Sequence, residues 1–502
     1  MLPENRSKTS QNIVMKLEGK KDKRTAQSLY WASFPIHYLG KLWGLIPVRF
    51  VTNAAPGRCQ ARLSTIDLIY SLCVLLLLLG LQICGLWRDL KNGWEHSTRL
   101  RSRTTVIATC SDVLGVMSLT VVCIVGSPFR WRYLQAVINK LIEVDEKVDE
   151  SSTKKSRRFT IYLTVCSLTY LWFNSILDFY SWHRKTKGMT DLKTIPDKGP
   201  INYMPLYLMY TVIILTEIQY TVSTYNVELR FISLNNSIKK LFEGGSAADY
   251  LKKCVLETTG QTHLFGQSYA GYATVAIVGD TRKQSSSTVS RRQFELASYR
   301  NFRNLNENET YVNSISELIT VHSSLCDAVT LINSAYGVVI LAVTVTCLLH
   351  LVITPYFLIL QVDENHEWIY LLVQCMWCIF HVTRMLIIVQ PSYSTVAEGK
   401  KTAVLVSRLL SSSFEVDSRQ QLEIFSLQLL HRPLEFSACG LFSLDRTLIT
   451  SIAGVVTTYL VILIQFKNAD DTMGEVDRIR NATQILKSAS SLQNLTGFKS
   501  II

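Results

Sequence analysis

The stretch Thr447–Phe466 has the sequence TLITSIAGVVTTYLVILIQF, which contains no acidic or basic residue in twenty positions. A helix of about twenty residues crosses the hydrocarbon core of a bilayer. Six further runs have similar length and composition: Ser64–Leu86, Val106–Gly126, Phe159–Tyr180, Met204–Tyr225, Ile332–Leu360 and Trp368–Gln390. Because lipid cannot hydrogen-bond the backbone, such runs must be helical. The sequence therefore predicts an all-α membrane protein with seven transmembrane helices.

The basic residues indicate how the chain is oriented in the membrane. The net charge is +13 over 502 residues, but Lys and Arg lie mainly in the N-terminal tail and the loops, so topology explains them better than nucleic-acid binding. They are abundant before the first span, between spans two and three, and between spans six and seven, whereas the turn 363–367 has none. This distribution predicts a cytoplasmic N-terminus and an extracellular C-terminus, although the loops after spans one and three are also basic.

The predicted spans divide the chain into segments. We expect a cytoplasmic N-terminal tail at 1–63, transmembrane helices 1–4 in 64–225, cytoplasmic helical extensions at 226–331, transmembrane helices 5–6 in 332–390, a cytoplasmic anchor region at 391–443, the seventh helix in 444–466 and an extracellular C-terminal tail at 467–502. Within the extensions, about 260–300 is rich in Gly, Ser and Thr and predicts a flexible insert.

Neither metal binding nor catalysis is indicated by the sequence. Most of the twelve cysteines lie inside apolar spans, where a thiol behaves as a small hydrophobe. Cys375 and Cys378 form a C-x-x-C in an apolar run, without the second ligand pair that a zinc site needs. No nucleophile and base are paired at a catalytic spacing. We therefore expect no metal, no cofactor and no enzyme.

The last span carries a family signature. Thr458 and Tyr459 are followed by five hydrophobic residues and then by Gln465 and Phe466, a specific match to the T-Y, five hydrophobic residues, Q-F signature of insect gustatory receptors. The preceding stretch from Ala438 also resembles that family. Within the family the chain looks most like the fructose-type receptors, from Gly440–Phe466 and from the run His350–Phe357, HLVITPYF.

The resemblance implies a ligand-gated, non-selective cation channel opened by a sugar, fructose above all. It implies a homotetramer in the plasma membrane of chemosensory neurons, surrounded by membrane lipids, with monovalent cations and calcium as permeant ions. The seventh span of each subunit is then expected to line the pore. A ring of Gln465 amides can replace part of a cation's hydration, and Phe466 can form an apolar gate. Ile462 and Leu463 are further lining candidates. Gln465 as a simple interfacial residue is the alternative.

Polar residues inside spans are the candidates for a ligand site, because burying them in a membrane is costly. Under the predicted topology the outer halves of three spans contain Asn174, Asp178, His350, Thr354, Gln374 and Trp377. Two pairs share a helix face, Asn174 with Asp178 and Gln374 with Trp377. Amides and carboxylates bind adjacent sugar hydroxyls and aromatic rings cover the sugar's C–H face. Tyr356 and Phe357 are expected to add such cover. The alternative for each is an interhelical hydrogen bond.

Four further ionisable residues lie inside the spans. The positions of Asp112 and Glu217 do not fit the outer cluster clearly. His381 and Arg384 lie one turn apart in the inner half of span six, where we expect them to pair with the backbone or with the cytoplasmic boundary.

Other classes of membrane protein fit less well. A G-protein-coupled receptor needs the opposite orientation, and the Asp-Arg-Tyr and Asn-Pro-x-x-Tyr motifs usual in that class are absent. A secondary transporter is expected to have repeated halves, and no internal repeat is visible. The nearest alternative is a receptor of the same superfamily for bitter compounds or an odorant.

Overall fold

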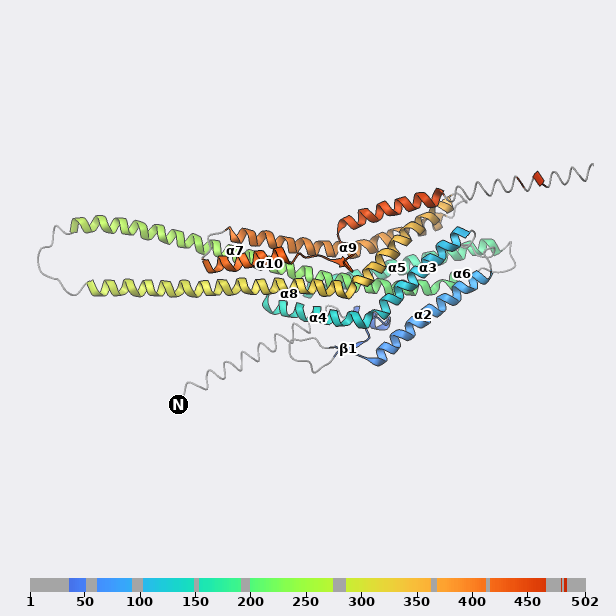
Figure 1. Ribbon diagram of the computed structural model, residues 1–502, viewed down its shortest axis with the longest axis horizontal. Coiled ribbons are helices and arrows are strands. Elements are labelled where there is room, and N and C mark those ends of the chain that lie inside the picture. The colour runs from blue at the N-terminus through green and yellow to red at the C-terminus, as the bar shows by residue number, and fades with distance from the viewer. Residues whose placement is uncertain are drawn as a thin grey trace, which may run out of the picture.

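A computed structural model describes residues 36–50, 61–92, 103–148, 153–190, 199–273, 286–362, 368–411 and 416–465, together with positions 480 and 483–484. In these ranges the chain is almost entirely helical (Figure 1). The helices are α2 (Thr65–Asn92), α3 (Arg103–Val125), α4 (Ser127–Lys147), α5 (Thr153–Thr190), α6 (Gly199–Asn202), α7 (Met204–Ala273), α8 (Ser286–Val362), α9 (Trp368–Leu410) and α10 (Val416–His431). A last helix covers Arg446–Gln465.

Six of the described helices are long and apolar enough to cross a membrane. They contain the segments Thr65–Lys91, Val106–Val125, Thr153–Arg184, Val312–Ile359, Trp368–Leu410 and Arg446–Gln465. Each overlaps one of the predicted spans, which confirms a helical, multi-pass membrane protein. The predicted fourth span, Met204–Tyr225, is helical but is not among the six. Glu217, Gln219 and several tyrosines lower its hydropathy, so the prediction of a seventh crossing stays a prediction.

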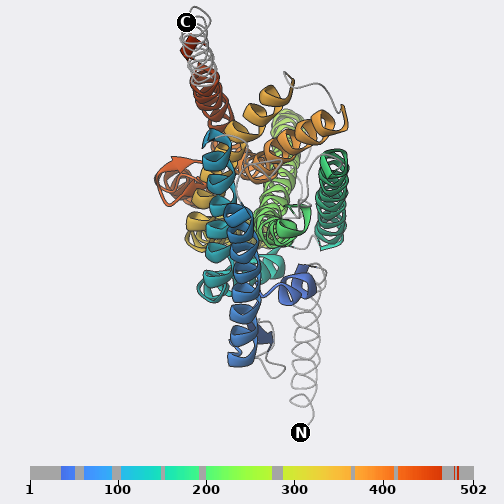
Figure 2. The same ribbon diagram turned by 90° about the vertical axis from the view of Figure 1, so that its right-hand side faces the viewer.

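Helix α7 lies at the centre of the bundle, which explains why it tolerates polar residues. Every residue of 205–222 except Leu208 is buried, and α7 packs against α2, α3, α5, α8 and α9. Figure 2, which looks along the long axis, shows the other helices arranged around it. A helix surrounded by protein contacts side chains rather than lipid, so its polar groups can find partners from neighbouring helices.

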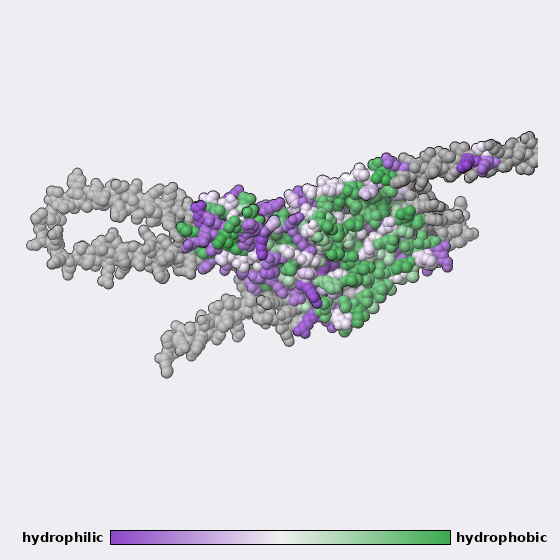
Figure 3. Space-filling model, viewed as in Figure 1, coloured by the Kyte–Doolittle hydropathy of each residue, from purple (hydrophilic) through white to green (hydrophobic). Residues whose placement is uncertain are grey.

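Helices α7 and α8 are the longest elements, with 70 and 77 residues. They continue side by side beyond the apolar part of the bundle, where α10 packs against α8 and α9 (Figure 1). Figure 3 shows a hydrophobic surface over the bundle and a more hydrophilic surface toward α10. Helix also occupies 260–273 and 286–300, where composition predicts a flexible insert, while 274–285 lie outside the described residues.

Two small antiparallel hairpins complete the fold. In the first, β1 (Val48–Phe50) pairs with β2 (Ala61–Leu63) just before α2, and Arg49 and Lys41 both contact Asp67. In the second, β3 (Ser437–Ala438) pairs with β4 (Phe442–Ser443). Its turn has positive φ at Cys439 and Gly440. The second hairpin leads directly into the last helix.

Candidate ligand site

The centre of the candidate site is the carboxylate of Asp178 on α5. One of its oxygens, Oδ2, accepts a hydrogen bond of 2.8 Å from the Tyr207 hydroxyl on α7. The same oxygen accepts one of 3.2 Å from Nε1 of Trp377 on α9. Asp178 is buried. A single oxygen atom thus joins three helices, and the second oxygen of the carboxylate still has acceptor capacity.

Helical spacing brings a second polar group beside Asp178 and another beside Trp377. Asn174 lies one turn before Asp178 on α5, and Gln374 lies one turn before Trp377 on α9; all four are buried. The hydroxyl of Tyr170 donates to the backbone oxygen of Met376 at 2.9 Å, which fixes α5 against α9 at this level. The two predicted pairs therefore face the interior of the bundle.

The amide of Asn174 has no hydrogen-bond partner. Asn174 is 0% exposed, and both its Nδ2 and its Oδ1 lack a partner in the described part of the chain. Buried amides without partners are rare in folded proteins, because their desolvation is not repaid. An unpartnered amide next to a carboxylate is therefore a strong candidate for contact with a bound molecule.

His350 on α8 lies at the edge of this cluster. Its Nε2 is 2.7 Å from Oδ1 of Asp112 on α3. Its ring stacks on that of His381 with centroids 4.5 Å apart and meets the ring of Tyr210 edge-on at 5.9 Å. Asp112, which sequence reasoning left unassigned, therefore lies within ion-pair distance of His350.

Three other candidates lie closer to the end of α8. Thr354 and Tyr356 are buried, and the Tyr356 and Phe357 rings are 6.0 Å apart. Their role as cover for a ligand stays a prediction, as does the ligand-binding role of the other candidates.

Arg384 on α9 corrects a prediction. Its Nε donates to both carboxylate oxygens of Glu217 on α7, at 3.0 and 3.2 Å, and its Nη2 donates to Oε1 at 2.5 Å. Both side chains are buried. We expected Arg384 to pair with the backbone or with the boundary of the membrane, which is wrong. A buried guanidinium needs a carboxylate, and Glu217 is the acid within the spans that can supply it.

Aromatic residues of α7 and α9 were missed by sequence reasoning. The Tyr210 ring lies 5.4 Å from the Trp377 ring and 5.9 Å from the Phe380 ring. Tyr207 stacks on Trp377 at 6.2 Å. The three-residue spacing of Tyr207 and Tyr210 was the available signal, because it places both on the face of α7 that turns toward α9.

Most of the last helix does not pack against the rest of the described chain. Only 6% of its most apolar stretch is buried. It contacts the core through Leu448, Ile449, Ile452 and Val456. The predicted lining residues Ile462 and Gln465 are exposed and Leu463 is half-buried. The motif residues Thr458 and Tyr459 are exposed, and Phe466 lies outside the described residues. This helix therefore offers a long surface to another molecule.

No metal site is found in the described ranges, where no three His, Cys, Asp or Glu side chains gather around one point. Cys375 and Cys378 are free thiols, one exposed and one half-buried.

Comparison with known proteins identifies the family. The family described as 7tm chemosensory receptor matches residues 33–470. The gustatory receptor for sugar taste 43a of Drosophila melanogaster is 27% identical over 442 residues, which cover 87% of this chain and 98% of that protein. The putative gustatory receptor 28a of the same species is 32% identical over 171 residues, 32% of this chain and 37% of that one.

Solved structures show the same fold. The insect olfactory receptor OR5 from Machilis hrabei has a TM-score of 0.53 at 13% identity and covers 86% of this chain and 97% of its own. Its complex with eugenol has a TM-score of 0.50 at 15% identity, covering 89% and 98%. Taken with the helical membrane architecture and the T-Y, Q-F signature, these matches show that the chain belongs to the 7tm chemosensory receptor family, a family of membrane receptors rather than enzymes, and they confirm the resemblance to insect gustatory receptors.

Proposed function

We propose that this protein is a gustatory receptor channel opened by a sugar, with fructose as the first candidate. The observation that carries the proposal is the unpartnered, fully buried Asn174 amide beside the Asp178 carboxylate. Adjacent hydroxyls on a sugar can accept from the amide N–H and donate to the amide and carboxylate oxygens. The Tyr207 and Trp377 rings are suited to cover the C–H face of the same ligand.

The comparisons favour a sugar over a bitter compound. The relative whose name includes sugar taste matches along 98% of its own length. The gustatory receptor for bitter taste 66a of Drosophila melanogaster matches over only 75 residues, 14% of either chain. A bitter alkaloid is also largely apolar and leaves buried amides unsatisfied, whereas a sugar pairs them.

The last helix is the proposed pore lining. Its outward face carries small and polar residues, at Thr447, Thr450, Ser451, Gly454, Thr458 and Gln465. Such a face is poorly suited to lipid tails but well suited to water and to other copies of the same helix. We infer a homotetramer in which four such faces surround a path for monovalent cations and calcium. Gln465 and Phe466 at its outer end are the proposed filter and gate.

The proposed topology has seven crossings, with the N-terminus in the cytoplasm and the C-terminus outside the plasma membrane of chemosensory neurons. The fourth crossing is α7, whose polar groups are covered by neighbouring helices. An epitope at residue 1 should be labelled only in permeabilised cells, and one after Ile502 should be labelled in intact cells. The reverse pattern contradicts the topology and favours a G-protein-coupled receptor.

The test of the ligand uses cells that express this chain alone, with sugars, polyols and alkaloids applied while current is recorded. We expect current with sugars. In Asn174→Leu the sugar response should be lost while surface expression is kept, because the substitution removes an unpaired buried amide and so does not destabilise the fold.

The matched control is Ser175→Ala on the next position of α5. Ser175 is also buried, but its hydroxyl already donates to the Leu171 backbone oxygen at 2.7 Å. This variant should respond as the wild type does. Activation by alkaloids and not by sugars supports the bitter-receptor alternative. A normal sugar response in Asn174→Leu means that the ligand binds elsewhere.

A further inference from the structure

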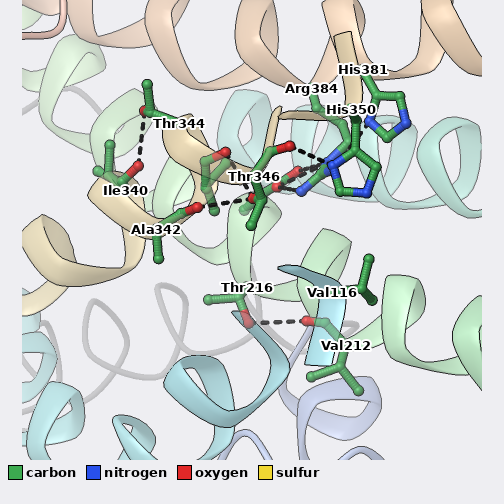
Figure 4. Close-up of polar contacts among 12 residues, drawn as sticks. Val116, Val212, Thr216, Ile340, Ala342, Thr344, Thr346, His350, His381 and Arg384 are labelled. Atoms are coloured by element: carbon green, nitrogen blue, oxygen red, sulfur yellow. Dashed lines mark hydrogen bonds and ion pairs between the residues drawn. The ribbon is translucent and has the colours of Figure 1, made fainter. Parts of the chain in front are cut away.

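We propose that Arg384 is a positioning residue that holds the aromatic rings beneath the ligand site in place, and that Glu217 is the residue that holds Arg384. The inference rests on the proposed function, because it concerns the same site. Figure 4 shows Arg384 gathered with His350 and His381 in the interior of the bundle. The guanidinium of Arg384 contacts the rings of Tyr210, Phe380 and His381, and these rings connect it with Trp377 and Asp178.

One edge of the guanidinium is fixed by the Glu217 carboxylate. Three hydrogen bonds of 2.5 to 3.2 Å connect Arg384 with the two oxygens of Glu217. This fork geometry sets both the position and the orientation of the guanidinium plane. Arg384 is 1% exposed and Glu217 is 2% exposed, so neither charge has water as an alternative partner.

The rest of the guanidinium is turned toward three rings. Its Cζ lies 5.8 Å from the ring centroid of Tyr210 and 5.8 Å from that of Phe380. Its Nη1 lies 3.5 Å from Nδ1 of His381. A guanidinium is attracted to aromatic faces, most strongly where water is excluded. The ion pair therefore fixes one side of an aromatic layer.

That aromatic layer supports Trp377. The centroid of the Trp377 ring is 5.4 Å from Tyr210, 5.3 Å from Phe380 and 6.0 Å from His381. Trp377 in turn donates its indole N–H to Asp178 at 3.2 Å. A displacement of Arg384 consequently moves the rings on which the indole rests and changes the distance between Trp377 and Asp178.

Stability alone does not account for a buried ion pair at this position. Burying two charges costs about as much as their attraction returns, and well-packed neutral residues often stabilise a core equally well. Removing one partner, in contrast, leaves an uncompensated charge and is strongly destabilising. A double substitution by neutral residues thus separates the two roles, because it removes the guanidinium without leaving an unpaired charge.

A second ion pair in the same chain, between a buried arginine and a half-buried aspartate, supplies a control. Nη2 of Arg230 on α7 donates to Oδ2 of Asp145 on α4 at 2.5 Å, and Arg230 is also buried. This pair lies beyond the predicted fourth span and touches none of the rings beneath the candidate site. It is also an arginine–carboxylate pair with a contact of 2.5 Å, although Arg230 donates to Asn226 as well, and it lies about 20 residues along α7 from Tyr210, roughly 30 Å away.

The experiment compares Glu217→Gln with Arg384→Gln, singly and together, and Asp145→Asn with Arg230→Gln in the same way. Surface amount, half-maximal sugar concentration and saturating current are measured for each. We expect the single variants of both pairs to reach the surface poorly and both double variants to recover. Only the Glu217→Gln/Arg384→Gln double should raise the half-maximal sugar concentration, by about tenfold, with saturating current retained.

Arg384→Lys is the second variant, in case the double does not fold. It keeps a positive charge for Glu217, but it lacks the planar fork that lies against the rings. We expect normal surface amounts and a raised half-maximal sugar concentration.

Two outcomes overturn the proposal. If the Glu217→Gln/Arg384→Gln double responds to sugar as the wild type does, the ion pair only stabilises the fold. If that double fails to fold, a wild-type sugar response in Arg384→Lys leads to the same conclusion. If both doubles shift the sugar response equally, the effect is a general loosening of the bundle. Failure of the proposed function itself is distinct, because it appears as a normal sugar response in Asn174→Leu.

Discussion

Nε1 of Trp377 and Oδ2 of Asp178 are 3.2 Å apart although the two residues are separated by 199 positions in the sequence. The contact joins α9 to α5, and the hydroxyl of Tyr207 adds α7 at the same oxygen. Two donors on one carboxylate oxygen hold the acid in a fixed orientation. The other oxygen and the neighbouring Asn174 amide are the groups that we propose bind the ligand.

Removal of either donor should weaken the response to sugar without abolishing it. Tyr207→Phe and Trp377→Phe each keep an aromatic ring but remove one hydrogen bond to Asp178. The carboxylate then turns more freely, and we expect the half-maximal sugar concentration to rise about fivefold, which corresponds to roughly 1 kcal/mol. The measurement is the concentration dependence of current at matched surface amounts. Unchanged curves in both variants mean that the orientation of Asp178 does not matter for binding.

Gly85 on α2 should not tolerate a methyl group. A Cβ at this position would lie 2.3 Å from the backbone oxygen of Asn202, whose side chain donates to Asp89 at 2.5 Å. Gly85→Ala must separate α2 from α6, and we expect a loss of about 1–3 kcal/mol in the free energy of unfolding. Thermal unfolding of the purified receptor measures it.

The control for this prediction is Gly80→Ala on the same helix. A Cβ at Gly80 has no atom within 4 Å, and alanine favours helix by up to about 1 kcal/mol relative to glycine. Gly80→Ala should therefore keep or raise the melting temperature. Equal melting temperatures for the two variants contradict the predicted contact between α2 and α6.

Glu228 should make stability depend on pH. Burial raises the pKa of this α7 carboxyl from 4.5 to about 7, with the Glu398 carboxylate adding to the rise and Lys401 opposing it. The folded protein thus holds a proton more tightly than the unfolded chain does. This contribution to stability is fully present below pH 4.5 and is lost as pH rises through about 7.

The test measures melting temperatures of the wild type and of Glu228→Gln between about pH 5 and pH 8, a range chosen around the raised pKa. The wild type should lose stability relative to the variant as pH rises. Glu243→Gln, a substitution of an exposed residue on the same helix, should keep the wild-type dependence. Parallel curves for the wild type and Glu228→Gln contradict the prediction.

The outer end of the last helix should control conduction. Consecutive residues on a helix point about 100° apart, so Gln465 and Phe466 cannot both face one axis, and a modest rotation exchanges one for the other. Phe466→Ala removes an apolar constriction and should give current without ligand. Gln465→Ala should keep the channel closed at rest but reduce current after sugar.

Whole-cell current before and after sugar, at matched surface amounts, measures both effects. A silent Phe466→Ala together with a Gln465→Ala that conducts like the wild type shows that the pore is lined elsewhere.

The course of the helices could be predicted from the sequence because it depends on local composition. The predicted span Ser64–Leu86 begins one residue before α2 (Thr65–Asn92), and the predicted first residue of the sixth span, Trp368, is the first residue of α9. Length and apolarity are sufficient for this, since a membrane leaves helix as the main way to satisfy the backbone. The distance to which α7 and α8 extend beyond the apolar bundle was less predictable, because both helices continue through polar sequence.

The pairing of polar groups could not be predicted, because it depends on contacts between distant segments. Spacing placed Gln374 and Trp377 on one face of α9, and both are buried. Spacing did not indicate that Arg384 pairs with Glu217 or that His350 pairs with Asp112, since each partner lies on another helix. Helix rotation and tilt decide such pairs, and a single sequence contains no direct record of either.

The length of α9 has one more consequence. The helix that carries Trp377 is continuous through Pro391 to Leu410, and near its far end Thr402 donates to Asn235 of α7 at 2.7 Å. About 25 residues at 1.5 Å each separate these two levels by roughly 37 Å. If the parts of α9 on either side of Pro391 move together, a tilt of about 3° at Trp377 displaces Thr402 by roughly 2 Å. In the proposed homotetramer, a small tilt of α9 at the ligand site would thereby become a larger movement at the far end of the helix.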